Sequence, residues 1–261
     1  MNLLRGLHDV SRIAYAVFFF YKYEKHLQNL SEFAEKEDWD YKFADSEFDL
    51  PVLYNYIRYT YKKLSDEGKI AVSLDGEFAC FDTGLVTKNQ EPIYAFFSKN
   101  KNPDKEPWYF AQWARKGDYV LNKFSVLPEM AHYFEDPNDL VFDTRLEIRE
   151  NVEHIIEENK ERFPEPFKSM DLYLLQTIFK GALDNAKMRV KRSYKIAIPQ
   201  YYRGRMQLLL PICLSNPNKA DIALTIEKMD GFYRASTILT LDMAYNNARQ
   251  IARPDKDWLQ P

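Results

Sequence analysis

The chain of 261 residues is poor in two residue types, with only eight glycines and two cysteines. No cluster of glycines forms a phosphate-binding loop, and the motifs G-x-G-x-x-G, H-E-x-x-H, C-x-x-C and G-x-S-x-G are all absent. These absences exclude the common signatures of dinucleotide-binding, metalloprotease, thiol-redox and serine-hydrolase sites. Cys80 and Cys213 are too few for a disulfide framework, and each lies in an apolar run. We therefore expect both to be reduced, buried and shielded from thiol reagents.

Long hydrophobic runs are also missing. The apolar stretch IAYAVFFFY at residues 13–21 is bounded by Arg12 and Lys22 and is too short to cross a bilayer. The residues after it, YKYEKHLQ, supply no cleavage site for a secretory signal. We expect a soluble, cytoplasmic protein without membrane contact, in which a helical segment over residues 7–30 packs on the core or on a partner.

Carboxylates are absent from one long segment, residues 185–220, although the chain as a whole has a net charge of −3. The segment carries eight basic residues: Lys187, Arg189, Lys191, Arg192, Lys195, Arg203, Arg205 and Lys219. Tyrosines lie between them, a combination that attracts phosphates and can stack on bases. The basic end of a helix followed by an edge strand would look the same. Residues 135–165 have the opposite character, with eleven acidic and four basic residues, and could neutralise the basic segment internally.

The fold class follows from the hydrophobic periodicity. Aromatic residues make up 15% of the chain, which predicts an ordered core. Helical spacing predicts helices over 51–64, 148–163, 169–190 and 240–252. Short apolar runs predict strands over 69–74, 77–81, 93–98, 108–114, 194–199, 205–214, 220–228 and 232–239, the first two joined by a type I′ turn at Asp75-Gly76. We expect an α+β protein with antiparallel or mixed sheets flanked by helices.

For domain organisation, we expect an N-terminal helical segment over residues 1–40 and an α+β domain over 41–261. The charged stretch at 135–168 is the candidate hinge.

The last predicted helix carries a polar stripe beside its apolar face. Asp242, Asn246, Arg249 and Arg253 follow one another at steps of four, three and four, so they share one side of the helix. A carboxylate, an amide and two guanidiniums in a row could hold a phosphate or the edge of a base. Alternatively, the row is an exposed stripe with local pairing.

His154 is the one residue near these charged segments that could exchange a proton at neutral pH. Glu150 and Glu158 lie four residues before and after it, so three potential metal ligands would share one helix face. A histidine on a glutamate-rich helix is more often structural or solvated, and we assign no metal site. Two carboxylates at Asp75 and Asp82 could bind Mg²⁺, but Asp75 is already explained by its turn.

Several stretches resemble the family called domain of unknown function 3825 (DUF3825). They are FDTGL (81–85), DTRLEIRENVEHI (143–155), YKIAIPQYYRGRMQLLLPICL (194–214), ADIAL (220–224) and TILTLDMAYNNARQIARPDKDWL (237–259). Some members of this family carry the domain beside OST-HTH (LOTUS) or cold-shock-like modules. The resemblance therefore implies a link to RNA metabolism and a partner protein that carries an RNA-binding module. The family usually reads F-N-T-G-L, whereas this chain has Asp82, so a site that used the amide would be altered.

Two functions of different classes fit these patterns, with a protein-interaction module as a third. The first is an RNA- or nucleotide-binding domain. The second is a phosphoryl-chemistry enzyme, a nuclease or cyclic-phosphate hydrolase, with His154 as acid and base and a carboxylate from Asp82, Asp221 or Asp242. No motif indicates a cofactor. We expect the acidic helix to face the basic segment across a cleft, with these residues around a phosphate-bearing ligand: Arg149, Asn151, His154, Lys191, Arg192, Lys195, Tyr201, Gln207, Asp242, Asn246 and Arg249.

Overall fold

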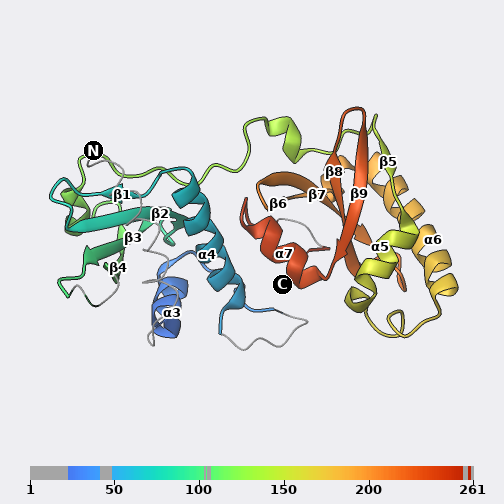
Figure 1. Cartoon of the computed structure of the whole chain (residues 1–261), viewed down its shortest axis with the longest axis horizontal. Helices are drawn as coiled ribbons and strands as arrows, with labels where there is room; N and C mark the ends of the chain where they lie inside the picture. The colour runs from blue at the N-terminus through green and yellow to red at the C-terminus, as the bar shows by residue number, and fades with distance from the viewer. Residues whose placement is uncertain (1–22, 42–48, 103, 105–106, 255–257, 260–261) are drawn as a thin grey trace. The chain divides into compact units, whose positions relative to one another are not determined.

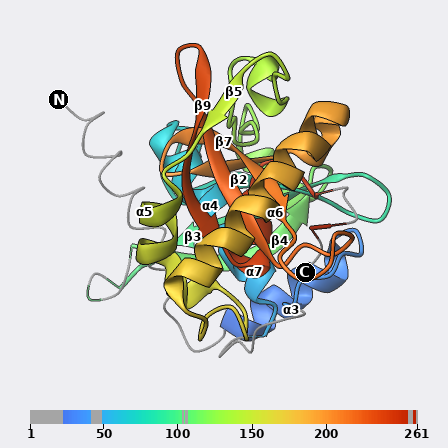
Figure 2. The same cartoon turned by 90° about the vertical axis from the view of Figure 1, so that its right-hand side faces the viewer.

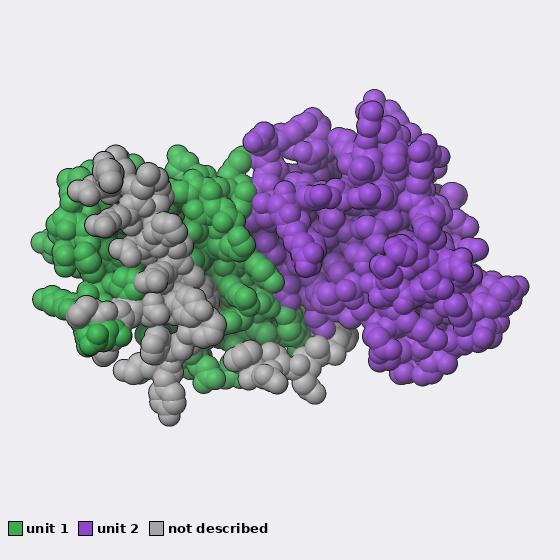
Figure 3. Space-filling model, in the orientation of Figure 1, with its two compact units in different colours: residues 1–41, 45–132 green, residues 42–44, 133–261 purple. Residues whose placement is uncertain are grey.

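The computed structural model describes residues 23–41, 49–102, 104, 107–254 and 258–259, and it has an α+β fold with two sheets. The chain divides into two compact units (Figure 3). Unit 1 comprises residues 1–41 and 45–132, and unit 2 comprises residues 42–44 and 133–261. This division differs from the predicted one at residue 40, and its main boundary lies just before the stretch expected to be a hinge. The apolar run at 13–21 lies outside the described residues.

Unit 1 is built on a four-stranded antiparallel sheet with the order β1-β2-β3-β4 (Figure 1). Its strands are β1 (Ala71–Val72), β2 (Phe78–Val86), β3 (Pro92–Lys99) and β4 (Trp108–Arg115). The helices are α3 (Tyr23–Phe33), α4 (Pro51–Asp66) and the 3₁₀ turn η1 (Tyr119–Lys123). Helix α4 packs on β2, where the Tyr61 and Phe81 rings meet edge to face. Helix α3 is tied to β4, because the Trp113 indole N–H donates to the His26 carbonyl. The described part of the N-terminal segment therefore belongs to unit 1.

The FDTGL motif forms an irregularity in β2 rather than an open site. The register between β2 and β3 shifts between Asp82 and Val86. The Thr83 hydroxyl donates to the Ile93 carbonyl at 2.7 Å and accepts from the Leu85 N–H. Gly84 has a φ of +71°, and a Cβ there would lie 2.6 Å from the Tyr56 hydroxyl, so this position requires glycine. The Gly84 N–H donates to Asp82 Oδ1 at 2.8 Å, a role that the amide of asparagine could also fill.

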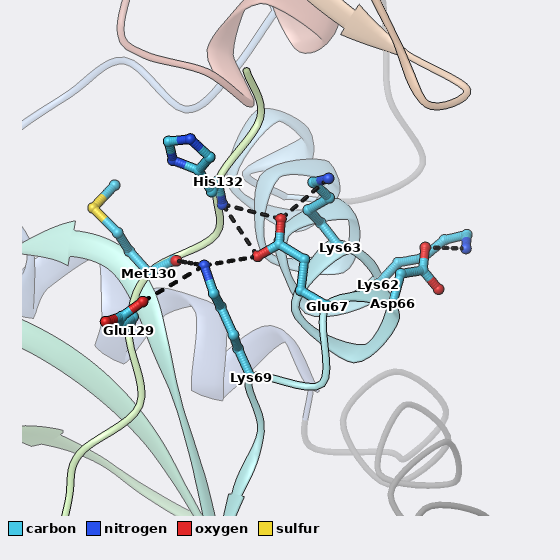
Figure 4. Close-up of polar contacts among 8 residues, drawn as sticks. All are labelled: Lys62, Lys63, Asp66, Glu67, Lys69, Glu129, Met130 and His132. Carbon is cyan, nitrogen blue, oxygen red and sulfur yellow. Dashed lines mark hydrogen bonds and ion pairs between the residues drawn. The ribbon is translucent and has the colours of Figure 1, made fainter. Parts of the chain in front are cut away.

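Glu67, just after α4, ties together three segments of unit 1 (Figure 4). Its carboxylate lies 3.1 Å from Lys63 Nζ and 3.1 Å from Lys69 Nζ. It also accepts the His132 N–H, and Lys69 donates onward to the Met130 carbonyl. Burial opposes ionisation of Glu67, but the hydrogen bonds from Lys63, Lys69 and His132 outweigh it and lower its pKa. The cluster fixes the strand-like stretch 129–132 against the end of α4.

The hairpin turns differ from the expected ones. At Asp75-Gly76 only the glycine has a positive φ, so the turn is not type I′. Instead, the Asp75 carboxylate accepts hydrogen bonds from the Ser73 hydroxyl and the Glu77 N–H. Two consecutive positive φ values occur at Arg203 and Gly204, between the paired residues Tyr202 and Arg205. The sequence predicts a turn between the runs at 194–199 and 205–214, but this pair lacks the Asn-Gly or Asp-Gly signal that would predict its tight geometry.

Unit 2 is built on a five-stranded mixed sheet with the order β5-β9-β8-β7-β6 (Figure 1). The strands are β5 (Glu147–Arg149), β6 (Ile198–Tyr202), β7 (Arg205–Ile212), β8 (Ile222–Lys228) and β9 (Phe232–Leu239). Strand β5 runs parallel to β9, and the other pairs are antiparallel. The helices are α5 (Val152–Asn159), α6 (Leu172–Arg192) and α7 (Leu241–Arg249), with 3₁₀ turns η2 (Pro137–Leu140), η3 (Lys160–Arg162) and η4 (Tyr194–Ile196).

The two faces of this sheet are covered by different helices. Leu208, Leu210 and Ile212 of β7 share one buried cluster with the apolar faces of α5 and α6. Side chains alternate along a strand, so Gln207 and Leu209 point to the other face. Helix α7 lies on that face, where the Asn247 amide donates to Gln200, the cross-strand partner of Gln207. Figures 1 and 2 show α7 on one side of the sheet and α5 with α6 on the other.

Both cysteines are free, but only one is fully buried. Burial raises the pKa of the Cys80 thiol to about 12. Cys213 is half-buried, and its sulfur accepts a hydrogen bond from Arg189, so the expected shielding of both thiols is only partly met. Among the described residues, no helix is long and apolar enough to cross a membrane.

Candidate functional site

The residues predicted to form one site are distributed over both faces of the unit 2 sheet. His154 lies on α5, whereas Asn246 and Arg249 lie on α7. Because the sheet separates α5 from α7, these three side chains do not meet in one pocket, and that expectation was wrong. The physical reason is that both faces of the sheet are apolar at alternate strand positions, so each face requires its own helices.

Asn151 and His154 have local roles in α5. The Asn151 side chain accepts from the His154 N–H and so caps the helix. The His154 Nε2 lies 3.5 Å from Glu158 Oε2, and both side chains are more than half exposed. No group of three or more potential metal ligands occurs in the parts of the chain that the structure describes.

The acidic and basic segments meet at one well-covered contact. Lys187 Nζ lies 2.6 Å from Glu150 Oε1, and each side chain is less than a quarter exposed. At this point the acidic and basic segments neutralise each other instead of facing each other across an open cleft. Lys191, Arg192 and Lys195 lie beyond it, at the end of α6 and in η4, together with the exposed ring of Tyr194. These three cations have no acidic partner in the described ranges, so the acid-free segment contributes one unneutralised cluster.

Three of the four residues of the predicted stripe are covered, whereas Arg253 lies past the end of α7 and is exposed. Asp242 and Arg249 are buried, and Asn246 is half-buried, with its amide donating to the Asp242 carbonyl. Burial raises the pKa of Asp242. Its Oδ1 is buried without a hydrogen-bond partner among the described residues. Beneath α7, Gln200 donates to Gln207 and Thr225, which continues the chain of amides that begins at Asn247.

A row of arginines extends from this amide chain across the uncovered end of the same face. Arg149 of β5 pairs with Arg234 of β9, and Arg234 pairs with Glu227 of β8. Leu208 of β7 pairs with Ile226 of β8 in antiparallel register. The residue before Leu208, Gln207, therefore lies across from the residue after Ile226, Glu227. The neighbouring residues Ile148, Ile226 and Tyr233 pack on the α5–α6 side, which fixes the arginines on the α7 side.

A second row lies beside the first and completes what we call the arginine face. It contains Phe232 of β9, Arg205 of β7 and Tyr202 of β6. Tyr202 is exposed and pairs with Arg205. The arginine face is defined as the side chains of Arg149, Arg205, Arg234, Phe232 and Tyr202.

Electrostatic contacts hold these arginines in place without covering them. Glu227 lies between two of them, 3.2 Å from Arg205 and 3.3 Å from Arg234, and its side chain is only 15% exposed. Arg149 pairs with Glu147, and its guanidinium lies 4.2 Å from the centre of the Phe232 ring. The three arginine side chains remain 50–64% exposed. Each guanidinium has five N–H donors, so most of its donors are available to a ligand.

The chemistry of the arginine face suits an extended anion with flat rings. Guanidiniums bind phosphates through paired N–H donors, and exposed aromatic rings stack on bases. Adjacent strands lie about 4.8 Å apart, so the arginines from β5 to β7 span about 14 Å. That span is large enough for more than one phosphate.

A pocket of about 500 Å³ lies at the same end of these strands, and Arg205, Gln207 and Glu227 from the side of the arginine face are among its lining residues. The rest of its lining comprises Asp139 of η2, Met206, Leu208, Lys228, Met229 and Tyr233. Lys228 Nζ lies 3.7 Å from Asp139 Oδ1, so these two charges offset each other. The pocket therefore adjoins the arginine face and shares Arg205 with it.

Sequence reasoning found part of the arginine face and missed the rest. Arg149 and Gln207 were predicted site residues, whereas Arg205, Phe232 and Arg234 were not. A usable signal was present in FYRAST, where period-two alternation puts Phe232 and Arg234 on the same side. The register that brings Arg149 beside Arg234 comes from a parallel pairing of distant segments, which no local pattern encodes.

The family model of DUF3825, described as a domain of unknown function, matches residues 30–258. Because this match covers most of the chain, the chain belongs to that family. No curated protein and no solved structure matches it.

Proposed function

We propose that this DUF3825 protein binds single-stranded RNA across the arginine face. The observation that carries the proposal is that Arg149, Arg205 and Arg234 are aligned on the open end of one sheet face, each more than 45% exposed. Positive side chains on a sheet that also offers aromatic rings are a common solution for binding single strands.

On this surface, flat side chains would stack on bases and an amide would form hydrogen bonds to them. Tyr202 is 44% exposed and lies at the edge of the sheet, where an unpaired base can reach its ring. Arg149 covers Phe232 and offers a planar guanidinium surface in place of that ring. Gln207, held by Gln200, adds an amide that can recognise the edge of a base.

The basic cluster of Lys191, Arg192 and Lys195 supports the same function as a second area of positive charge. Its lack of acidic partners among the described residues leaves its field unneutralised. We expect it to add affinity through counterion release without sequence preference.

The geometry gives the hydrolase alternative less support. Of its carboxylate candidates in unit 2, Asp221 accepts hydrogen bonds from the N–H groups of Leu214 and Ser215, and Asp242 lies on the far side of the sheet from His154. Asp221 is thus already used to hold the loop between β7 and β8.

The test is a fluorescence-anisotropy titration of a labelled, unstructured RNA of about 15 nucleotides at low salt. The triple variant Arg149→Ala, Arg205→Ala and Arg234→Ala should weaken binding about 100-fold, if each contact contributes about 1 kcal/mol. The matched control, Arg115→Ala, Arg145→Ala and Lys168→Ala, removes the same charge from other exposed ion pairs. It should weaken binding less than threefold. Equal losses in the two variants, or no binding by the unmodified protein, would refute the proposal.

A further inference from the structure

The pocket at the end of the unit 2 sheet lies in a fork between β7 and β8. Strand β7 pairs with β6 as far as Arg205, and β8 pairs with β9 as far as Lys228. The two central strands, however, pair with each other only as far as Leu208 and Ile226. Beyond that pair, successive residues of both strands line the pocket. Because successive side chains point to opposite faces of a strand, the pocket opens into the end of the sheet, between its two faces.

The inner wall of the pocket is apolar. Leu208 and Tyr233 are buried, and the longer side chains of Met206 and Met229 are half-buried. Thioether side chains adapt their shape and contact aromatic rings favourably. The volume of about 500 Å³ lies within the range of small-molecule sites, about 300–1,000 Å³, so the pocket has room for one nucleoside.

On one side of the pocket, Asp139 of η2 and Lys228 of β8 place opposite charges side by side. The 3₁₀ turn η2 packs against β6 and β7, which brings Asp139 to the fork. Lys228 Nζ lies 3.7 Å from Asp139 Oδ1, which is longer than a hydrogen bond. Neither side chain forms a hydrogen bond within the described residues, and the two are 43% and 41% exposed. An accepting carboxylate and a donating ammonium are therefore both available to a ligand.

Among the bases of RNA, guanine matches this pair of groups. Its Watson–Crick edge carries the O6 acceptor beside two donors, N1–H and N2–H. The Asp139 carboxylate accepts from both N–H groups while the Lys228 ammonium donates to O6. Adenine and cytosine would present a lone-pair nitrogen to the carboxylate, and uracil a carbonyl on each side of its single N–H. Each of these bases would leave the carboxylate facing an acceptor, which is unfavourable.

From this combination we infer that the fork between β7 and β8 is a binding site for a guanine nucleotide. Arg205 lines the pocket and also belongs to the arginine face, so it holds the phosphate of that nucleotide. The chemistry is the same for one unstacked guanosine of a bound RNA and for a free mononucleotide. The first source rests on the proposed RNA binding, whereas the second does not.

Single-base changes in RNA test the first source. Anisotropy titrations compare an oligouridine of about 15 nucleotides with the same strand carrying one central guanosine, inosine or adenosine. Guanosine should raise the affinity about tenfold over uridine or adenosine, because a bidentate contact to a base gives discrimination of this order. Inosine lacks the 2-amino group, so its affinity should fall between those of guanosine and adenosine.

Asp139→Asn tests the assigned contact. It replaces an acceptor oxygen with a donor, so the preference for guanosine over adenosine should fall below about twofold. The matched control is Asp230→Asn, which removes the same charge from the exposed turn between β8 and β9, outside the lining of the pocket. The control should keep the preference, and both variants should change the affinity for oligouridine less than about threefold. Equal preferences for guanosine in the two variants would overturn the inference.

Calorimetric titration with guanosine 5′-monophosphate and adenosine 5′-monophosphate tests the second source. The guanine nucleotide should bind about tenfold more tightly to the unmodified chain, and Asp139→Asn should remove this difference. Selectivity in the RNA titrations alone would identify RNA as the source of the guanine.

The two experiments separate this inference from the proposed function. If the chain binds RNA without preferring guanosine and does not distinguish the two mononucleotides, the inference fails and the proposed RNA binding stands. If it selects the guanine mononucleotide but binds no RNA, the proposed function fails and the pocket is a site for the free nucleotide. A chain that binds neither would contradict both.

Discussion

Each unit of this protein contains a glutamate held between two cations, and the cations of the two clusters differ in their exposure to solvent. In unit 1, Glu67 lies between Lys63 and Lys69, and all three side chains are 17–26% exposed. In unit 2, Glu227 is similarly covered, but its partners Arg205 and Arg234 remain at least half exposed. Lys69 also donates to the Met130 carbonyl and lies 3.8 Å from the exposed Glu129 carboxylate, whereas most guanidinium donors of Arg205 and Arg234 face solvent.

On our proposal, this difference separates a structural cluster from an RNA-binding surface. An ion pair contributes to the fold when its partners are covered and hydrogen-bonded to backbone, as around Glu67. When the cations stay exposed, the pair contributes little stability and orients the cations for a ligand. The two clusters therefore differ both in the exposure of their cations and in the kind of cation, lysine around Glu67 and arginine around Glu227.

The largest expected effect comes from removing the charge of Glu67. Glu67→Gln should lower the free energy of unfolding of unit 1 by about 2 kcal/mol, because Lys63 and Lys69 lose a largely covered anion. The measurement is urea unfolding followed by tryptophan fluorescence, since Trp39, Trp108 and Trp113 lie in unit 1. The contribution of Glu67 is present above its unfolded pKa and is lost as the pH falls through its lowered folded pKa.

Asp66→Asn is the matched control for Glu67→Gln. Asp66 also pairs with a lysine four residues earlier, Lys62 at 2.9 Å, but both side chains are more than 60% exposed (Figure 4). Its loss should cost less than about 0.5 kcal/mol. Equal costs for the two variants would show that coverage is not what gives the Glu67 cluster its role.

Asp82 provides the contrasting case of a carboxylate in unit 1 without a cation. Burial raises the pKa of Asp82, so ionisation disfavours the folded state. Asp82→Asn keeps an acceptor for the Gly84 N–H and removes the charge, and it should stabilise the protein by about 1 kcal/mol at pH 7.

The pH dependence of that gain follows from the direction of the shift. The unmodified protein loses stability as the pH rises through the raised pKa of Asp82, whereas the variant does not. The difference between them in urea unfolding should therefore disappear below about pH 4, where the unfolded carboxyl group is protonated as well. If the free energies of unfolding of the two proteins differ by the same amount at pH 4 and at pH 7, ionisation of Asp82 is not the cause of the gain.

The smallest expected effect is a gain in RNA affinity. Glu227→Gln removes a negative charge from the arginine face, so the affinity for RNA should rise about threefold at low salt. Its cost in stability should be smaller than that of Glu67→Gln, because Arg205 and Arg234 can be solvated. The anisotropy titration and urea unfolding measure the two quantities. Weaker RNA binding would mean that Glu227 positions the arginines more than it repels phosphate.

The sequence predicted the helices and strands of this fold better than the turns that connect them. The short apolar runs RMQLLLPICL and ADIALTIEK predicted strands now seen as β7 and β8, and helical spacing predicted α6 and α7. A turn was expected between the strands at 194–199 and 205–214, but its tight geometry at Arg203-Gly204 was not, because this pair is neither Asn-Gly nor Asp-Gly. Asp75-Gly76 adopts another turn because Asp75 bonds to its neighbours.

The candidate site was predicted less well, for a physical reason. Arg149 and Arg234 are 85 positions apart in the sequence and meet only through the parallel pairing of β5 with β9. The charge pattern of residues 185–220 pointed to Arg205 only as one of eight cations. Which cations are paired and which are exposed depends on the packing of α6 and on the register of β7 and β8, and local patterns contain neither.

The most direct test of the central claim is the salt dependence of RNA binding. For single strands, each phosphate contact contributes about −0.7 to the slope of log K against log salt concentration. The slope of the unmodified protein should therefore exceed in magnitude that of the Arg149, Arg205 and Arg234 triple alanine variant by about 2. The control triple variant of Arg115, Arg145 and Lys168 should retain the original slope. Identical slopes for the unmodified protein and the arginine-face variant would contradict the claim that these three arginines contact phosphate.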